Sequence, residues 1–110
     1  MTSVLIERDE NGVLVSCKAE GHAGYAKRGS DIVCSAVTVL IRTALHVISE
    51  LPDVKLEVDA SERGRINFRV LSFPSGSEEK LKVAGDFLAV GLGSIAEEYP
   101  DNLELVINSL

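Results

Sequence analysis

The sequence predicts an α+β fold, a two-layer sandwich in which two helices cover one face of a largely antiparallel or mixed sheet. Apolar residues alternate with polar ones in several short segments, as in strands with one solvated face. In two longer segments they recur every three or four residues, as in helices. With 110 residues, 45% of them hydrophobic and 25% charged, we expect one domain over residues 1–110. The expected element order is ββαββαβ.

The first two strands are expected at residues 3–8 and 13–20, joined by a turn that contains Asn11 and Gly12. Asn-Gly between two apolar runs is a strong hairpin signal because both residues tolerate a positive φ. These two strands should therefore pair antiparallel. Cys17 falls at an inward position of the second strand, where it is expected to be a small core residue.

The first helix is expected over residues 32–51, where apolar residues are three and four apart and Pro52 follows. Val39 and Val47 lie off the main stripe, so we expect this helix to be largely buried. Arg42 interrupts its apolar run well short of the ~20 residues of a membrane span, and the first residues do not resemble a secretion signal. We therefore expect a cytoplasmic protein, in which both cysteines stay reduced.

A second hairpin is expected from strands at 54–59 and 65–70 with a turn at 61–64, and a last strand at 103–107. The second helix should begin after Ser77, whose hydroxyl is expected to cap it, and run to about Tyr99, before Pro100. Acidic residues at 78 and 79 suit the first turn of a helix. The helix contains glycines, which we expect to permit close packing on the first helix or the sheet: Gly85, Gly91 and Gly93.

A candidate site lies where a glycine-containing loop leads into the first helix, with His22 before the loop and Cys34 after it. If Asp31 is the N-cap, Cys34 is the third helical residue, where backbone amides and the positive helix end stabilise an anion. His22 could then serve as the base for a Cys34 nucleophile. Spacing alone leaves the alternative open that Cys34 is a structural residue of a buried helix.

Three other uses of these residues are disfavoured. His46 is 12 positions beyond Cys34, about 18 Å along one helix, so it cannot be the base and cannot complete a zinc site with Cys34. The loop lacks the GK[ST] ending of a phosphate cradle, and Asp31 would place a carboxylate where the phosphate belongs. A net charge of −6 disfavours direct binding of nucleic acid. Because His46 lies too far from Cys34 to share a metal ion with it, we expect no metal site.

Supporting roles are expected for several neighbours of the two candidate residues. Asp31 can cap the helix, worth about 1 kcal/mol, or orient His22, and both roles can hold at once. The backbone amide of Ser35, with that of Cys34, could line an oxyanion hole. The loop glycines permit unusual backbone angles and the mobility of a loop that closes over a substrate: Gly21, Gly24 and Gly29.

The stretches GHAGYA (21–26) and GSDIVCSAV (29–37) closely resemble the signature of the ribosomal-processing cysteine protease family, Prp. The resemblance implies a bacterial cytoplasmic endopeptidase that removes a short N-terminal extension of large-subunit ribosomal protein twenty-seven, after a hydrophobic, typically aromatic, run. It places the catalytic dyad on His22 and Cys34, and it implies a homodimer, no cofactor and a glycine-rich loop that orders when substrate docks. The alternative is a ribosome-assembly module that binds the same extension without cutting it.

Overall fold

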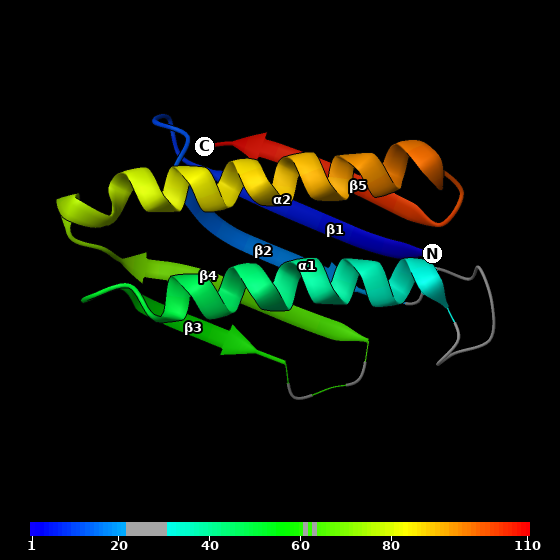
Figure 1. Cartoon of the computed structure of the whole chain (residues 1–110), viewed down its shortest axis with the longest axis horizontal. Coiled ribbons are helices and arrows are strands. Elements are labelled where there is room, and N and C mark those ends of the chain that lie inside the picture. Colours follow the sequence, from blue (N-terminus) through cyan, green and yellow to red (C-terminus); the bar gives the residue numbers. More distant parts are fainter. Residues whose placement is uncertain (22–30, 61, 63) are drawn as a thin grey trace.

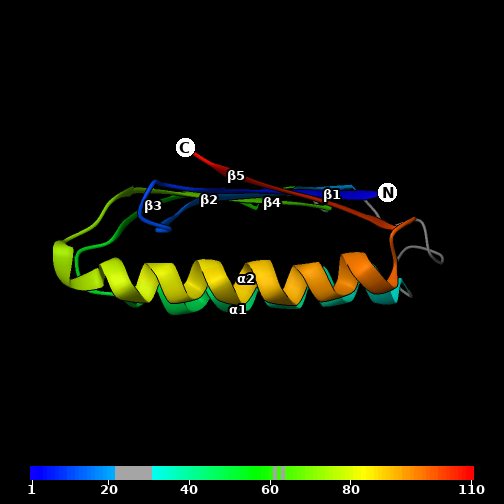
Figure 2. The same ribbon diagram turned by 90° about the horizontal axis from the view of Figure 1, so that it is seen from above.

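The computed structural model describes residues 1–21, 31–60, 62 and 64–110. The elements follow one another as β1 (Thr2–Arg8), β2 (Leu14–Glu20), α1 (Ile32–Ser49), β3 (Lys55–Asp59), β4 (Arg65–Ser72), a 3₁₀ turn η1 (Ser75–Ser77), α2 (Glu78–Glu98) and β5 (Leu103–Ser109). Figures 1 and 2 show α1 and α2 side by side in one layer against one face of the sheet. The predicted two-layer α+β sandwich and its ββαββαβ order are confirmed.

The sheet has five strands in the order β3-β4-β2-β1-β5. Neighbouring strands pair antiparallel, except that β1 and β5 are parallel. The sheet is therefore mixed, and β1 lies between β2 and β5. In Figure 1, β1 begins at the end of the sheet where α1 also begins, which brings the first residues of the chain close to the candidate site.

The hairpin of β1 and β2 forms as predicted, but its turn differs. Gly12 has a φ of +83°, whereas Asn11 has no positive φ. A carboxylate oxygen of Asp9 accepts hydrogen bonds from the amides of Asn11 and Val13, at 2.8 and 3.0 Å. Because Asp9 organises the loop in this way, only one residue needs the left-handed region, and the two-residue Asn-Gly turn is not used.

The inner side of α1 packs on the sheet and on α2 through five buried residues: Val33, Val37, Ile41, Ala44 and Ile48. Ile32, Val39 and Val47 are exposed, so the prediction of a largely buried helix was wrong. The layer of helices is one helix thick, and nothing in the described chain covers its outer side. By length and composition alone α1 could cross a membrane, but in this fold one side of it packs on the sheet and on α2.

The second helix ends before Pro100 as predicted, and it buries Leu81, Leu88 and Leu92. Ser77 precedes it but makes no side-chain capping hydrogen bond; that part of the prediction was wrong, because η1 continues directly into α2 and Ser77 itself has helical angles. A Cβ on Gly91 would lie 3.1 Å from Leu40 of α1. This glycine thus permits close packing of the two helices.

Candidate active site at the start of α1

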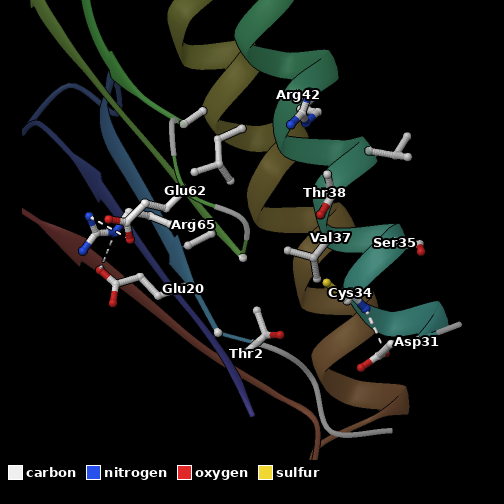
Figure 3. A pocket seen from close by; sticks show the side chains of 16 residues that line it. Thr2, Glu20, Asp31, Cys34, Ser35, Val37, Thr38, Arg42, Glu62 and Arg65 are labelled. Atoms are coloured by element: carbon white, nitrogen blue, oxygen red, sulfur yellow. Dashed lines mark hydrogen bonds and ion pairs between the residues drawn. The ribbon is translucent and has the colours of Figure 1, made fainter. Parts of the chain in front are cut away.

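Asp31 caps α1 as the sequence predicts. One carboxylate oxygen, Oδ1, accepts from the amides of Val33 and Cys34 at 3.0 and 3.1 Å. The backbone of Asp31 is extended, with φ −75° and ψ 106°, and its side chain is only 2% exposed. Cys34 therefore occupies the third helical position. Figure 3 shows its sulfur directed from α1 into a cavity.

The cavity beside Cys34 has a volume of about 450 Å³. It lies between the first half of α1 and the ends of β1, β2 and β4, and its apolar lining includes Val37, Ala19 and Ile66. This volume is within the range of small-molecule and peptide-side-chain sites. The described chain thus presents a thiol at the wall of a cavity, which is the placement a nucleophilic cysteine requires.

Charged groups stand at the outer rim of the cavity. Arg65 lies 3.6 Å from Asp59, 3.8 Å from Glu62 and 4.0 Å from Glu20. These groups are partly or largely exposed, so each pair contributes little to stability. Arg42 of α1 also lines the cavity. The rim is therefore polar, while the wall next to Cys34 is mostly apolar.

The expected oxyanion hole does not fit the geometry of the first turn. The Cys34 amide donates to Asp31 Oδ1, and the Ser35 amide donates to the Asp31 carbonyl oxygen at 3.1 Å. Both donors are thus already engaged. The side chain of Ser35 is exposed, and Figure 3 shows its hydroxyl pointing away from the cavity. In this structure the two amides are therefore not free to line an oxyanion hole, while the supporting role of Ser35, which lines the cavity, stays a prediction.

Two buried polar atoms in the cavity wall have no hydrogen-bond partner within the described chain: Oδ2 of Asp31 and Oγ1 of Thr2. Thr2 was not among the residues predicted from the sequence. Thr2, Val4 and Ile6 share one side of β1, so the alternation along this strand could have indicated that Thr2 faces inward. Asp31 therefore uses one oxygen as a cap and keeps the other available.

Gly21 lies at the edge of the same cavity and has the unusual backbone angle expected of it, while its role in a substrate loop stays a prediction. Its φ is +88°, and a Cβ there would lie 2.8 Å from the carbonyl oxygen of Met1. Its amide donates to the carbonyl of Gly64 at 2.8 Å. His22, Gly24 and Gly29 lie outside the described residues, so their predicted roles stay predictions.

The remaining histidine and cysteine lie away from the site. His46 pairs with Glu50 at 3.0 Å on the exposed side of α1 and does not line the cavity of Cys34. Cys17 is fully buried among core residues, and burial raises the pKa of its thiol to about 12. The prediction that Cys17 is a core residue is confirmed.

Comparisons with known proteins show the family of the chain. The model of the family described as "Cysteine protease Prp" matches residues 1–104. The chain is 27% identical to "Ribosomal processing cysteine protease Prp" of Bacillus subtilis, over 98% of each chain.

Two crystal structures share the fold. One is an essential ribosomal processing protease Prp from S. aureus in complex with a covalently linked product peptide, with a TM-score of 0.82, 22% identity and coverage of 97% of this chain and 99% of that one. The other is SMU.848 from Streptococcus mutans, with a TM-score of 0.76, 29% identity and coverage of 100% and 96%. With its cysteine in the cavity wall and a family match over nearly its whole length, the chain belongs to the cysteine protease Prp family.

Proposed function

We propose that the chain is a single-domain cysteine endopeptidase that removes the short N-terminal extension of large-subunit ribosomal protein twenty-seven. The observation that carries this proposal is the position of Cys34, in the first turn of α1 and directed into a cavity, in a chain that belongs to a cysteine protease family. The relative from Bacillus subtilis is named a ribosomal processing protease. An acidic chain with net charge −6 also suits a basic ribosomal substrate.

In the proposed mechanism, His22 takes the proton of Cys34, and the sulfur attacks the scissile carbonyl carbon. The carbonyl electron pair moves to oxygen, which becomes an oxyanion. When the tetrahedral intermediate collapses, the C–N bond breaks and His22 gives its proton to the departing amine. Water then releases the acyl group from the sulfur, with His22 as the base. No cofactor takes part in these steps.

Asp31 has two roles in this proposal. Oδ1 caps α1 through two amides, and Oδ2 is buried without a partner in the described chain. We assign Oδ2 the task of accepting a hydrogen bond from the imidazole N–H of His22, which would fix the ring orientation and stabilise the imidazolium. The remaining loop glycines, Gly24 and Gly29, would let the segment before α1 close over the substrate.

We further propose that the enzyme acts as a cytoplasmic homodimer, joined through the outer side of the helices. This outer helix face carries exposed apolar side chains from both helices: Val39, Val47, Val83, Phe87 and Val90. A groove of about 390 Å³ lies between the two helices on this face. An apolar surface of this kind is typical of an interface.

Phe87→Glu should shift the mass measured by light scattering to that of a monomer, whereas Leu71→Glu, at an exposed site on the sheet, should not.

The decisive experiment is cleavage of a peptide that spans the extension and the first residues of the mature ribosomal protein, followed by mass spectrometry. The wild type should produce one cut after the hydrophobic run. Cys34→Ala and His22→Ala should leave the peptide intact, and Cys17→Ala should still cut it, because Cys17 lies in the core. Cleavage by Cys34→Ala at the wild-type rate would exclude the mechanism.

The same experiment distinguishes the alternative of a ribosome-assembly module without catalytic activity. Such a module would bind the peptide and leave it intact, and its binding would survive Cys34→Ala. Binding can be measured by fluorescence anisotropy with the same labelled peptide.

A further inference from the structure

Thr2 occupies a core-facing position at the start of β1. Successive side chains of a strand point to opposite faces, so Thr2 shares its side with Val4 and Ile6, and all three are at most 3% exposed. The position is well fixed, because the Thr2 amide donates to the carbonyl of Asn102 at 3.0 Å and Thr2 pairs with Leu103 of β5. A side chain on a paired strand is held more rigidly than one on a loop.

The Thr2 hydroxyl has no hydrogen-bond partner within the described chain. Buried polar groups are nearly always paired, and one that is not is a common sign of a catalytic or binding role. A valine would fill the same space on β1 without this defect. The unpaired hydroxyl therefore lowers the free energy of unfolding, and its packing does not offset this loss.

Thr2 lines the same cavity as Cys34. Figure 3 shows its hydroxyl directed across the cavity toward the first turn of α1. Three amide donors of this turn are engaged elsewhere: those of Val33 and Cys34 with Asp31 Oδ1, and that of Ser35 with the Asp31 carbonyl. Of the two unpaired buried atoms in the wall, Asp31 Oδ2 is an acceptor, so Thr2 Oγ1 is the one that can donate.

We propose that the Thr2 hydroxyl donates a hydrogen bond to the oxyanion formed when Cys34 attacks the scissile carbonyl. This inference rests on the proposed protease function. The S–C bond forms, the carbonyl electron pair moves to oxygen, and Thr2 keeps its proton while its O–H binds the new negative charge. The hydroxyl then takes the place of the Cys34 and Ser35 amides, which were expected to line the oxyanion hole. A donor fixed in advance by a strand needs no reorganisation when the charge appears.

The test compares Thr2→Val, which removes the hydroxyl and keeps the branched shape, with Thr2→Ser, which keeps the hydroxyl. For cleavage of the extension peptide, Thr2→Val should lower kcat by about 100-fold and change KM by less than about threefold. Thr2→Ser should stay within about fivefold of the wild type. The melting temperature of Thr2→Val should equal or exceed that of the wild type, because an unpaired buried group is removed.

Two probes of Cys34 separate the oxyanion from the nucleophile. A peptide aldehyde adds to the sulfur and places an oxygen where the oxyanion forms, so its inhibition constant should rise about 100-fold in Thr2→Val. Iodoacetamide alkylates the sulfur by displacement and forms no oxyanion, so its rate should be unchanged in that variant. An unchanged kcat in Thr2→Val, a change in KM alone, or a Thr2→Ser variant as slow as Thr2→Val would each overturn the inference.

A wild type that cleaves no peptide would instead contradict the proposed function. In that case the aldehyde decides the inference on Thr2. If the wild type binds the aldehyde about 100-fold more tightly than Thr2→Val does, the inference is supported. If both bind it equally, or neither binds it, the inference is overturned.

Discussion

Asp31 has a structural task as a helix cap and a proposed chemical task toward His22, and two substitutions separate them. Asp31→Ala removes the cap and leaves the amides of Val33 and Cys34 without their acceptor. Substitution of a capping residue by alanine costs about 0.5–2 kcal/mol, and we expect the upper end, about 2 kcal/mol, because the cap is buried and serves two donors. For a domain of this size that corresponds to a fall in melting temperature of roughly 8 °C.

Asp31→Asn should behave differently. Asparagine caps helices about as well as aspartate, so the free energy of unfolding should change by less than about 0.5 kcal/mol. The amide group that replaces Oδ2 offers a donor where the imidazole N–H of His22 needs an acceptor. Because loss of such an acceptor disturbs the histidine tautomer, kcat should fall by at least about 100-fold.

The assays are thermal unfolding by circular dichroism and steady-state cleavage of the extension peptide, on both variants and the wild type. If Asp31→Asn keeps kcat within about twofold of the wild type, Asp31 is a cap only, and its proposed role toward His22 is wrong. If Asp31→Asn is as unstable as Asp31→Ala, the capping geometry does not determine the stability of this turn.

The remaining predictions concern Cys17, Gly21 and Arg8. Since burial raises the pKa of Cys17 from 9.0 to about 12, the folded state keeps a proton that the unfolded chain loses. Stability should therefore fall between about pH 9 and 12, by up to about 1.4 kcal/mol per pH unit, and urea unfolding of Cys17→Ala should show a shallower fall. Gly21→Ala should destabilise by about 1–3 kcal/mol, because the residue is left-handed and close to a backbone oxygen. Gly93→Ala, where a Cβ would meet nothing within 4 Å, should instead stabilise by up to about 1 kcal/mol in the same chemical denaturation. Arg8→Met should cost about 2 kcal/mol, since the guanidinium donates to the carbonyls of residues 12 and 82; a change below about 0.5 kcal/mol would contradict this assignment.

Features governed by neighbouring residues could be predicted from the sequence. The cap by Asp31 and the third helical position of Cys34 depend only on the backbone angles and amides of the first turn of α1. Both are as expected. The inward position of Cys17 follows from alternation along one strand. The ends of the helices also follow from local signals, with α2 ending before Pro100.

Features that depend on distant parts of the chain could not be predicted. The strand order places β1 between β2 and β5, and nothing in the local pattern of β1 indicates this. The exposure of Val39 and Val47 depends on the helices forming one layer with no second layer outside it. The hydrogen bonds of Asp31 that engage the expected oxyanion donors depend on side-chain geometry rather than on spacing.

The pairing of β1 with β5 has a consequence for when the protein can become active. Thr2 is held in place by Asn102 and Leu103, which lie far from it along the chain. The wall of the cavity beside Cys34 is therefore complete only after β5 has formed and paired with β1. A chain in which β5 has not yet paired with β1 would therefore carry Cys34 beside an unfinished cavity wall, so the candidate site would form late in folding.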